Sequence, residues 1–185
     1  IRDRIYTSLN GQSWTKQTPD LTTYGLLGGT VSNNKIVIVG EHGKLYYSTN
    51  STTWTSGSIS GSPITTNING VSYGNGIYVA VGDKIGTNST DPGLILVSSN
   101  GTSWTQVSSA YYSTYNLNKV TYGSNGYFYI VGDNNTVLRS LNGSNWENMS
   151  NIQVTDPYYI VKGNDFLYGY GPEELVPGIV TDTLS

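Results

Sequence analysis

Few residues of this sequence are suited to catalysis. Its single histidine, His42, stands in the short segment Gly40-Glu41-His42-Gly43, and no Gly-x-Ser-x-Gly nucleophile elbow accompanies it. Cysteine is absent, which excludes thiol nucleophiles, disulfides and thiolate zinc sites. We therefore interpret His42 as an exposed turn residue and predict no enzyme activity, no metal and no cofactor.

Acidic residues recur at one place in the sequence. Glu41, Asp83 and Asp133 each directly follow a Val-Gly pair that ends an apolar run, and Glu173 falls near the corresponding place further on. If these runs surround one axis, the four acids lie around one mouth of a central channel, where they could bind a cation or a polar ligand. The alternative is that Asp and Glu simply suit tight turns.

A repeated hairpin is the element that must position these acids. Each tryptophan of the chain ends the pattern Ser-x-Asn-Gly-x-x-Trp, with Ser51 in place of Gly in the second copy. The pattern follows an apolar run and is typical of a β-hairpin with an Asn-Gly turn. We expect a structural role for its tryptophans and asparagines, which are Trp14, Trp54, Trp104, Trp146, Asn10, Asn50, Asn100 and Asn142.

The spacing of the tryptophans predicts the fold. They lie about 40 to 50 residues apart, a period typical of the blades of a β-propeller. Between them, short strands and tight turns lead into the apolar runs that end at Val-Gly, so each unit holds four antiparallel strands, here named a to d. No segment has helical periodicity. We predict an all-β chain that forms a small β-propeller of four blades.

The two ends of the chain are complementary in this prediction. Whole blades are expected at about 21–56, 65–108 and 116–150. Residues 1–18 supply only strands c and d, and residues 152–171 only a and b, so together they would form a composite fourth blade. The propeller domain would then cover 1–171, with 172–185 as an extended arm. The alternative is a portion of a larger propeller.

The hairpin pattern resembles the Asp-box (BNR-like) repeat, Ser-x-Asp-x-Gly-x-x-Trp, which lies at the c–d hairpin of β-propellers. The resemblance covers nearly the whole chain in four copies. This sequence has Asn for Asp and one residue fewer before Gly, which argues against calcium binding there. Some Asp-box propellers are sialidases, which resemble one another in an arginine triad. Arg2, Arg4 and Arg139 do not converge on one face, so this resemblance implies fold and not activity.

The long connections all fall on the side of the b–c and d–a loops. They cover about 16–24, 56–67, 83–93 and 108–118, whereas the a–b and c–d turns are short. Long loops on a rigid scaffold are where binding sites commonly lie, and tyrosine suits glycans and protein surfaces. The candidate binding residues on this face are Tyr111, Tyr112, Tyr115, Lys84 and Asp91. The alternative is solvated loop variation.

Composition narrows the partners. The net charge is −3 and only 11% of residues are charged, so we expect no nucleic-acid partner. No apolar run approaches the roughly 18 residues of a membrane span, so we expect no membrane insertion. Abundant Ser, Thr, Asn and Gly favour a virion or extracellular location.

The C-terminal residues 171–185 resemble a segment of tailed-bacteriophage virion structural proteins, although an ordinary linker is the alternative. We therefore expect a non-enzymatic structural or binding module of a phage tail, fibre or surface decoration. Its partners would be other virion proteins or a host-surface glycan or protein. The alternatives are a secreted bacterial lectin-like propeller and, less favoured, a sialidase-type glycoside hydrolase.

Overall fold

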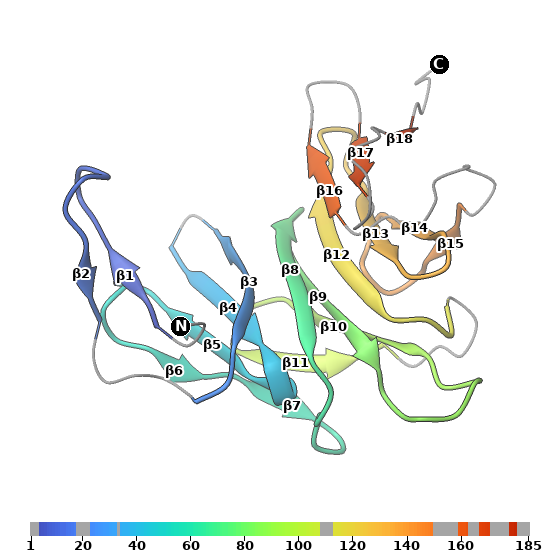
Figure 1. Ribbon diagram of the computed structural model, residues 1–185, viewed down its shortest axis with the longest axis horizontal. Coiled ribbons are helices and arrows are strands. Elements are labelled where there is room, and N and C mark those ends of the chain that lie inside the picture. The colour runs from blue at the N-terminus through green and yellow to red at the C-terminus, as the bar shows by residue number, and fades with distance from the viewer. Residues whose placement is uncertain are drawn as a thin grey trace.

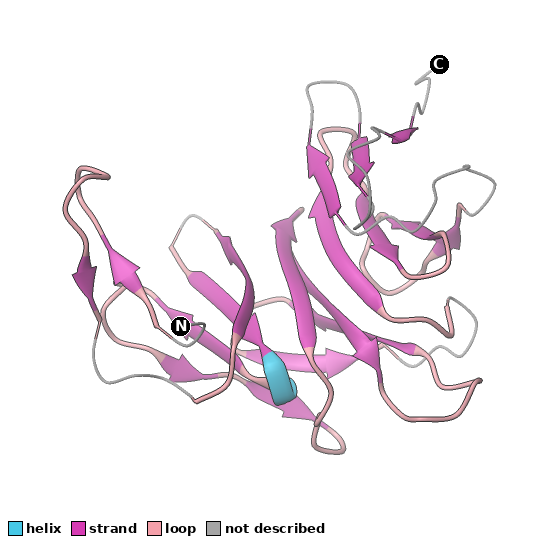
Figure 2. Cartoon of the chain, in the orientation of Figure 1, coloured by secondary structure: helices cyan, strands magenta, loops and turns pink. Residues whose placement is uncertain are grey.

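The computed structural model describes residues 4–17, 23–32, 34–107 and 113–149, together with the backbone of three strands near the C-terminus. Strands and turns make up nearly all of the described chain (Figure 2). The single helical turn described is η1 (Glu41–Gly43). None of the described helical structure is long and apolar enough to cross a membrane. The all-β class is confirmed.

Three antiparallel sheets form the body of the molecule. The first sheet contains β3 (Leu26–Val31), β4 (Ile36–Gly40), β5 (Leu45–Ser48) and β6 (Thr55–Ser56). The second contains β8 (Ile68–Gly74), β9 (Ile77–Lys84), β10 (Gly93–Ser98) and β11 (Ser103–Gln106), with β7 (Ser58–Ser60) added at its edge. The third contains β12 (Leu117–Tyr122), β13 (Phe128–Gly132), β14 (Thr136–Ser140) and β15 (Glu147–Asn148).

Smaller elements flank these sheets at both ends. The N-terminal hairpin consists of β1 (Tyr6–Thr7) and β2 (Thr15–Lys16). The C-terminal sheet consists of β16 (Tyr159–Lys162), β17 (Leu167–Tyr170) and β18 (Gly178–Val180). The sheets are arranged as an open arc, in which β3, β8, β12 and β16 are neighbours in chain order on the inner side (Figure 1).

The core lies between neighbouring sheets. In β9, alternate residues face opposite ways, so Tyr78 and Ala80 pack in the cluster with the first sheet, and Val79 and Val81 in the cluster with the third. Such strands, buried on both faces, require apolar residues without interruption, which explains the continuous run in β9. The contact between sheets, and not any single sheet, therefore provides the hydrophobic stabilisation.

The tryptophan hairpins share one set of local hydrogen bonds. In all four, the asparagine Oδ1 accepts the backbone N–H groups two and three residues on, at 2.7–3.1 Å. The residue after the asparagine has positive φ, between 62° and 72°, and is Gly11, Ser51, Gly101 or Gly143. Each turn is thus closed by its own side chains.

The composite fourth blade is not formed in this structure. The N-terminal hairpin and the C-terminal sheet are separate sheets at opposite ends of the arc (Figure 1). The edge of β17 pairs with β18, which lies within the predicted C-terminal arm. Pairing β17 with a strand close in sequence closes a much shorter loop than pairing it with β1, and short loops cost less entropy.

The connection at 56–67 also differs from the expected long loop. Ser58–Ser60 forms β7, which pairs in parallel with Ser103, Trp104 and Thr105 of β11. The unpaired backbone groups of an outer strand are a ready template for a further strand. Part of this connection therefore extends the second sheet.

Candidate binding pocket at the strand ends

The acidic residues occupy equivalent positions in the three sheets. Strand pairing places Leu26, Ile68 and Leu117 opposite the glycines that end β4, β9 and β13. The register shifts by one residue directly after each of these positions, which is the pattern of a β-bulge. The acid follows the glycine in every sheet, so the repeat brings each carboxylate to the same end of the inner strand.

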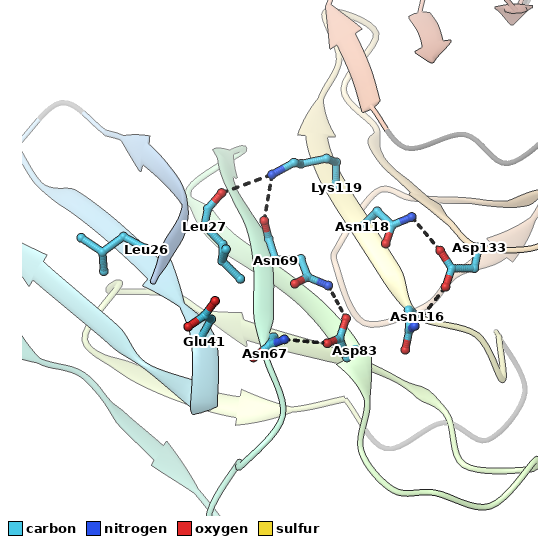
Figure 3. A pocket seen from close by; sticks show the side chains of 10 residues that line it. All are labelled: Leu26, Leu27, Glu41, Asn67, Asn69, Asp83, Asn116, Asn118, Lys119 and Asp133. Carbon is cyan, nitrogen blue, oxygen red and sulfur yellow. Dashed lines mark hydrogen bonds between the residues drawn. The ribbon is translucent and has the colours of Figure 1, made fainter. Parts of the chain in front are cut away.

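Two of the carboxylates are held by paired asparagines. Asp83 accepts hydrogen bonds from Asn67 Nδ2 at 2.9 Å and from Asn69 Nδ2 at 2.6 Å (Figure 3). Asp133 accepts the same two bonds, each at 2.9 Å, from Asn116 and Asn118. The Asn-x-Asn segment at the start of the inner strand thus fixes the carboxylate that follows the neighbouring strand.

The first sheet reaches a similar result with a longer acid. Gly25 and Leu27 replace the two asparagines, and the backbone N–H of Gly25 donates to Glu41 Oε2 at 2.8 Å. A Cβ atom at Gly25 would lie 2.9 Å from Glu41 Oε1. Glycine is therefore needed for the glutamate to fold back against the strand.

The first asparagine of each pair also links neighbouring sheets. Asn67 Oδ1 accepts the backbone N–H of His42 from the first sheet at 3.2 Å. Asn116 Oδ1 accepts the backbone N–H of Lys84 from the second sheet at 3.0 Å. Each amide therefore fixes its own acid and the connection from the preceding sheet at once.

Lys119 crosses the inner strands of the arc. Its Nζ donates to the carbonyl of Asn69 at 3.0 Å and to that of Leu27 at 3.3 Å (Figure 3). The equivalent residues in the other two sheets are Gly28 and Gly70, so the third sheet alone carries a side chain there. Burial lowers the pKa of Lys119, because desolvation penalises its charged form.

These residues line a pocket of about 670 Å³, here called the strand-end pocket. Its lining residues are Leu26, Leu27, Glu41, Asn67, Asn69, Asp83, Asn116, Asn118, Lys119 and Asp133. In the described part of the chain, none of the three carboxylates has a cationic partner within ion-pair distance. The pocket therefore has an excess of negative charge and hydrogen-bonding amides. No group of three metal-ligating side chains comes together among the described residues.

Two exposed tyrosines precede the pocket residues. Tyr24 and Tyr115 each stand one residue before an equivalent pocket position, and are 39% and 43% exposed. The Tyr24 ring packs against His42 with ring centroids 4.3 Å apart. Tyr111, Tyr112 and Glu173, which the sequence also indicated, lie outside the described residues.

Lys84 and Asp91 stabilise their own loop. Lys84 Nζ donates to the carbonyl of Asn88 at 2.7 Å, and Asp91 Oδ2 accepts the backbone N–H of Asn88 at the same distance. The β9–β10 loop lies on the same side of the molecule as η1 (Figures 1 and 2). These two side chains therefore shape the loop that borders the pocket.

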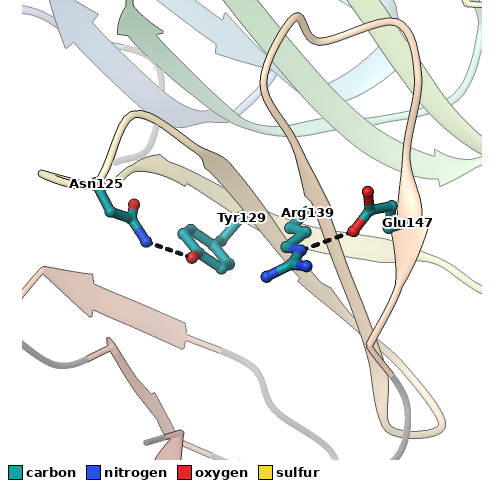
Figure 4. A network of polar contacts seen from close by, with 4 residues as sticks. All are labelled: Asn125, Tyr129, Arg139 and Glu147. Carbon is teal, nitrogen blue, oxygen red and sulfur yellow. Dashed lines mark hydrogen bonds and ion pairs between the residues drawn. The ribbon is translucent and has the colours of Figure 1, made fainter. Parts of the chain in front are cut away.

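The residues considered for catalysis are dispersed. His42 is exposed in η1. Arg139 Nε donates to Glu147 Oε2 at 2.8 Å across the third sheet, where Asn125 also donates to the Tyr129 hydroxyl (Figure 4). Arg4 is exposed in the segment before β1, and Arg2 lies outside the described residues.

The sequence analysis missed most of the pocket. It identified Glu41, Asp83 and Asp133, but not the four asparagines, Lys119 or Tyr24 that surround them. The repeated Asn-x-Asn, at 67–69 and 116–118, was a visible signal. Lys119 left none, because glycine occupies its position in the other sheets.

No protein-family model and no curated protein matches the chain. Solved structures do. Virginiamycin B lyase from Staphylococcus aureus aligns with a TM-score of 0.71 at 12% identity, covering 91% of this chain and 56% of the lyase. YCF48 bound to D1 peptide aligns with a TM-score of 0.61 at 14% identity, covering 85% of this chain and 55% of YCF48.

YCF48 from Cyanidioschyzon merolae gives a TM-score of 0.58 at 15% identity, covering 88% of this chain and 58% of its own. The chain thus spans little more than half the length of these structures. At such low identity, the similarity shows the fold alone. Together with the repeated four-stranded sheets, it shows that this chain has the β-propeller fold.

Proposed function

We propose that this chain is a non-enzymatic binding module whose strand-end pocket receives a basic side chain of a polypeptide partner. The observation that carries the proposal is the set of three repeated carboxylates, Glu41, Asp83 and Asp133, which line one pocket without a cationic partner in the described chain. A lysine or arginine side chain would supply the missing charge and donate to the carboxylate oxygens.

The surroundings of the pocket support a polypeptide as the partner. Tyr24 and Tyr115 offer exposed aromatic area beside the pocket, and tyrosine is a common anchor in protein recognition. A solved structure with this fold, YCF48, has a peptide bound. The exposed tyrosines and amides also favour a second candidate ligand, a glycan, which binding to a glycan array would support.

A matched pair of variants tests the charge. E41Q removes one carboxylate from the pocket but keeps an oxygen that can accept from Gly25, whereas E147Q removes the same charge from the distant third sheet. We expect E41Q to weaken binding of a lysine-rich fluorescent peptide about two- to fivefold, since partly exposed ion pairs contribute about 0.2–1 kcal/mol. E147Q should leave the affinity unchanged.

Fluorescence anisotropy provides the measurement, with a second peptide in which glutamine replaces every lysine. Equal affinity for the two peptides would contradict a basic ligand. Equal effects of E41Q and E147Q would mean that only net charge matters, which would place the contact outside the pocket.

We further propose that the four hairpins are variants of the Asp-box repeat, and that the module acts outside the cell or on a tailed-phage particle. The first idea is supported by the asparagine-closed turns, and the second by the C-terminal resemblance and the low charge alone. Copurification with virions tests the phage setting. The similarity to a lyase makes quinupristin, which is bound in a catalytically inactive variant of that enzyme, the substrate to try first. We expect no turnover.

A further inference from the structure

The tryptophan of each later hairpin packs against the sheet that precedes it in the chain. Trp104 shares a buried cluster with Val37 and Leu45 of the first sheet. Trp146 shares a second cluster with Val79 and Ile95 of the second sheet. The tryptophan side of a hairpin is therefore one half of an interface, and a preceding sheet is the other half.

Trp14 occupies the same position but has no such cover. Its hairpin is fully formed, since Asn10 closes the turn and Trp14 Nε1 donates to the carbonyl of Gly11 at 3.2 Å. Nevertheless 61% of Trp14 is exposed, and Leu9 and Tyr6 are exposed beside it in sequence. The N-terminal hairpin thus presents an apolar surface of the kind that a preceding sheet covers elsewhere in the described chain.

The opposite end of the arc carries the matching half. The C-terminal sheet follows the third sheet just as the third follows the second, with β16 beside β12 on the inner side (Figure 1). In a closed ring, the sheet that precedes the N-terminal hairpin is the one that ends the arc. Within one chain these two elements are separated by the full width of the arc.

We propose that a second copy of this chain covers the Trp14 surface, with the C-terminal sheet of each copy against the N-terminal hairpin of the other. The length of the arc supports two copies, because the chain spans 55–58% of the solved propellers that it matches. Two such arcs, joined head to tail about a two-fold axis, complete one ring and leave no exposed end. The ring would contain two strand-end pockets.

Two leucines at the same position of the hairpin pattern give a matched test. Leu9 precedes Asn10 and Leu141 precedes Asn142; both side chains are exposed, at 108% and 53%. Neither takes part in the hydrogen bonds that close its turn, so serine at either position leaves the hairpin intact. We expect L9S to weaken association roughly tenfold, as loss of a buried apolar anchor does at interfaces, and L141S to leave it unchanged.

Light scattering coupled to size-exclusion chromatography measures the mass of the full chain over a concentration series. We expect twice the 20.0 kDa of one chain for the wild type and for L141S, and dissociation at higher concentration for L9S. Tryptophan emission should shift to the red on dilution of the wild type, as Trp14 becomes exposed, and W14F should lack this shift. A single-chain mass at every concentration, or equal effects of L9S and L141S, overturns the proposal.

Discussion

The hairpins at Ser8–Trp14 and Ser98–Trp104 have the same turn and opposite environments. In both, the serine Oγ accepts the glycine N–H at 2.8 Å, and the asparagine Oδ1 accepts the next two N–H groups. Yet Trp14 is 61% exposed and Trp104 only 1%. A seven-residue pattern is therefore enough to form the turn, but a neighbouring sheet is needed to bury the tryptophan.

The cost of burial also appears in the indole nitrogens. Trp14 Nε1 donates to Gly11, whereas Trp104 Nε1 is buried and has no hydrogen-bond partner. An unpaired buried donor costs free energy, which the apolar contacts of the ring must exceed. Burial against the first sheet and β7 evidently determines how the Trp104 ring is placed.

The largest expected effect concerns the two tryptophans themselves. W104A should lower the free energy of unfolding by about 3–5 kcal/mol, because it opens a cavity between two sheets. W14A should change it by less than about 0.5 kcal/mol in the dissociated chain, since exposed side chains contribute little. Urea denaturation at low protein concentration measures both. Similar losses in the two variants would mean that the N-terminal hairpin is packed in solution.

The asparagines sharpen the comparison. N100A removes the acceptor for the N–H groups of Thr102 and Ser103, and should lower the free energy of unfolding by about 1 kcal/mol. N100D keeps an acceptor oxygen and should stay near the wild-type value. If N100D loses as much as N100A, the turn does not depend on this acceptor.

The equivalent change in the N-terminal hairpin should act locally. N10A should accelerate hydrogen exchange at Gln12 and Ser13 while changing the global free energy of unfolding by less than about 0.5 kcal/mol. An equal global loss in N10A and N100A would contradict the distinction between an uncovered and a covered hairpin.

The smallest effect is expected at the one hairpin that lacks glycine. Ser51 has a φ of 62°, a left-handed conformation that costs a non-glycine residue roughly 1–2 kcal/mol. S51G should raise the free energy of unfolding by about 0.5–1 kcal/mol, because the greater freedom of unfolded glycine offsets part of the gain. Thermal denaturation measures the shift. A decrease would show that the exposed bond from Ser51 Oγ to the carbonyl of Asn50 outweighs the strain.

The strand-end pocket shows where sequence reasoning succeeded and where it stopped. Repetition after Val-Gly was enough to place Glu41, Asp83 and Asp133 at equivalent strand ends. Lys119 could not be found in this way, because its ammonium bonds to Leu27 and Asn69, which are 92 and 50 residues away in the chain. Only the packing of three inner strands brings these groups together.

The strand pairings follow the same division. Strands that are neighbours in sequence paired as the short turns and alternation predicted. The expected pairing of the chain ends was wrong for this structure, and β7 and β18 were not foreseen as strands. Both add to the edge of a sheet whose position depends on the whole arc.

The sequence by itself determined the turns, the strands and the repeat, since each depends on residues within one hairpin or one blade. The tertiary structure alone decided which tryptophans are buried, which sheet edges gain a strand, and which charges share a pocket. The physical reason is range. Turn hydrogen bonds join residues two or three positions apart, whereas burial and pocket chemistry depend on surfaces that meet only when the sheets pack.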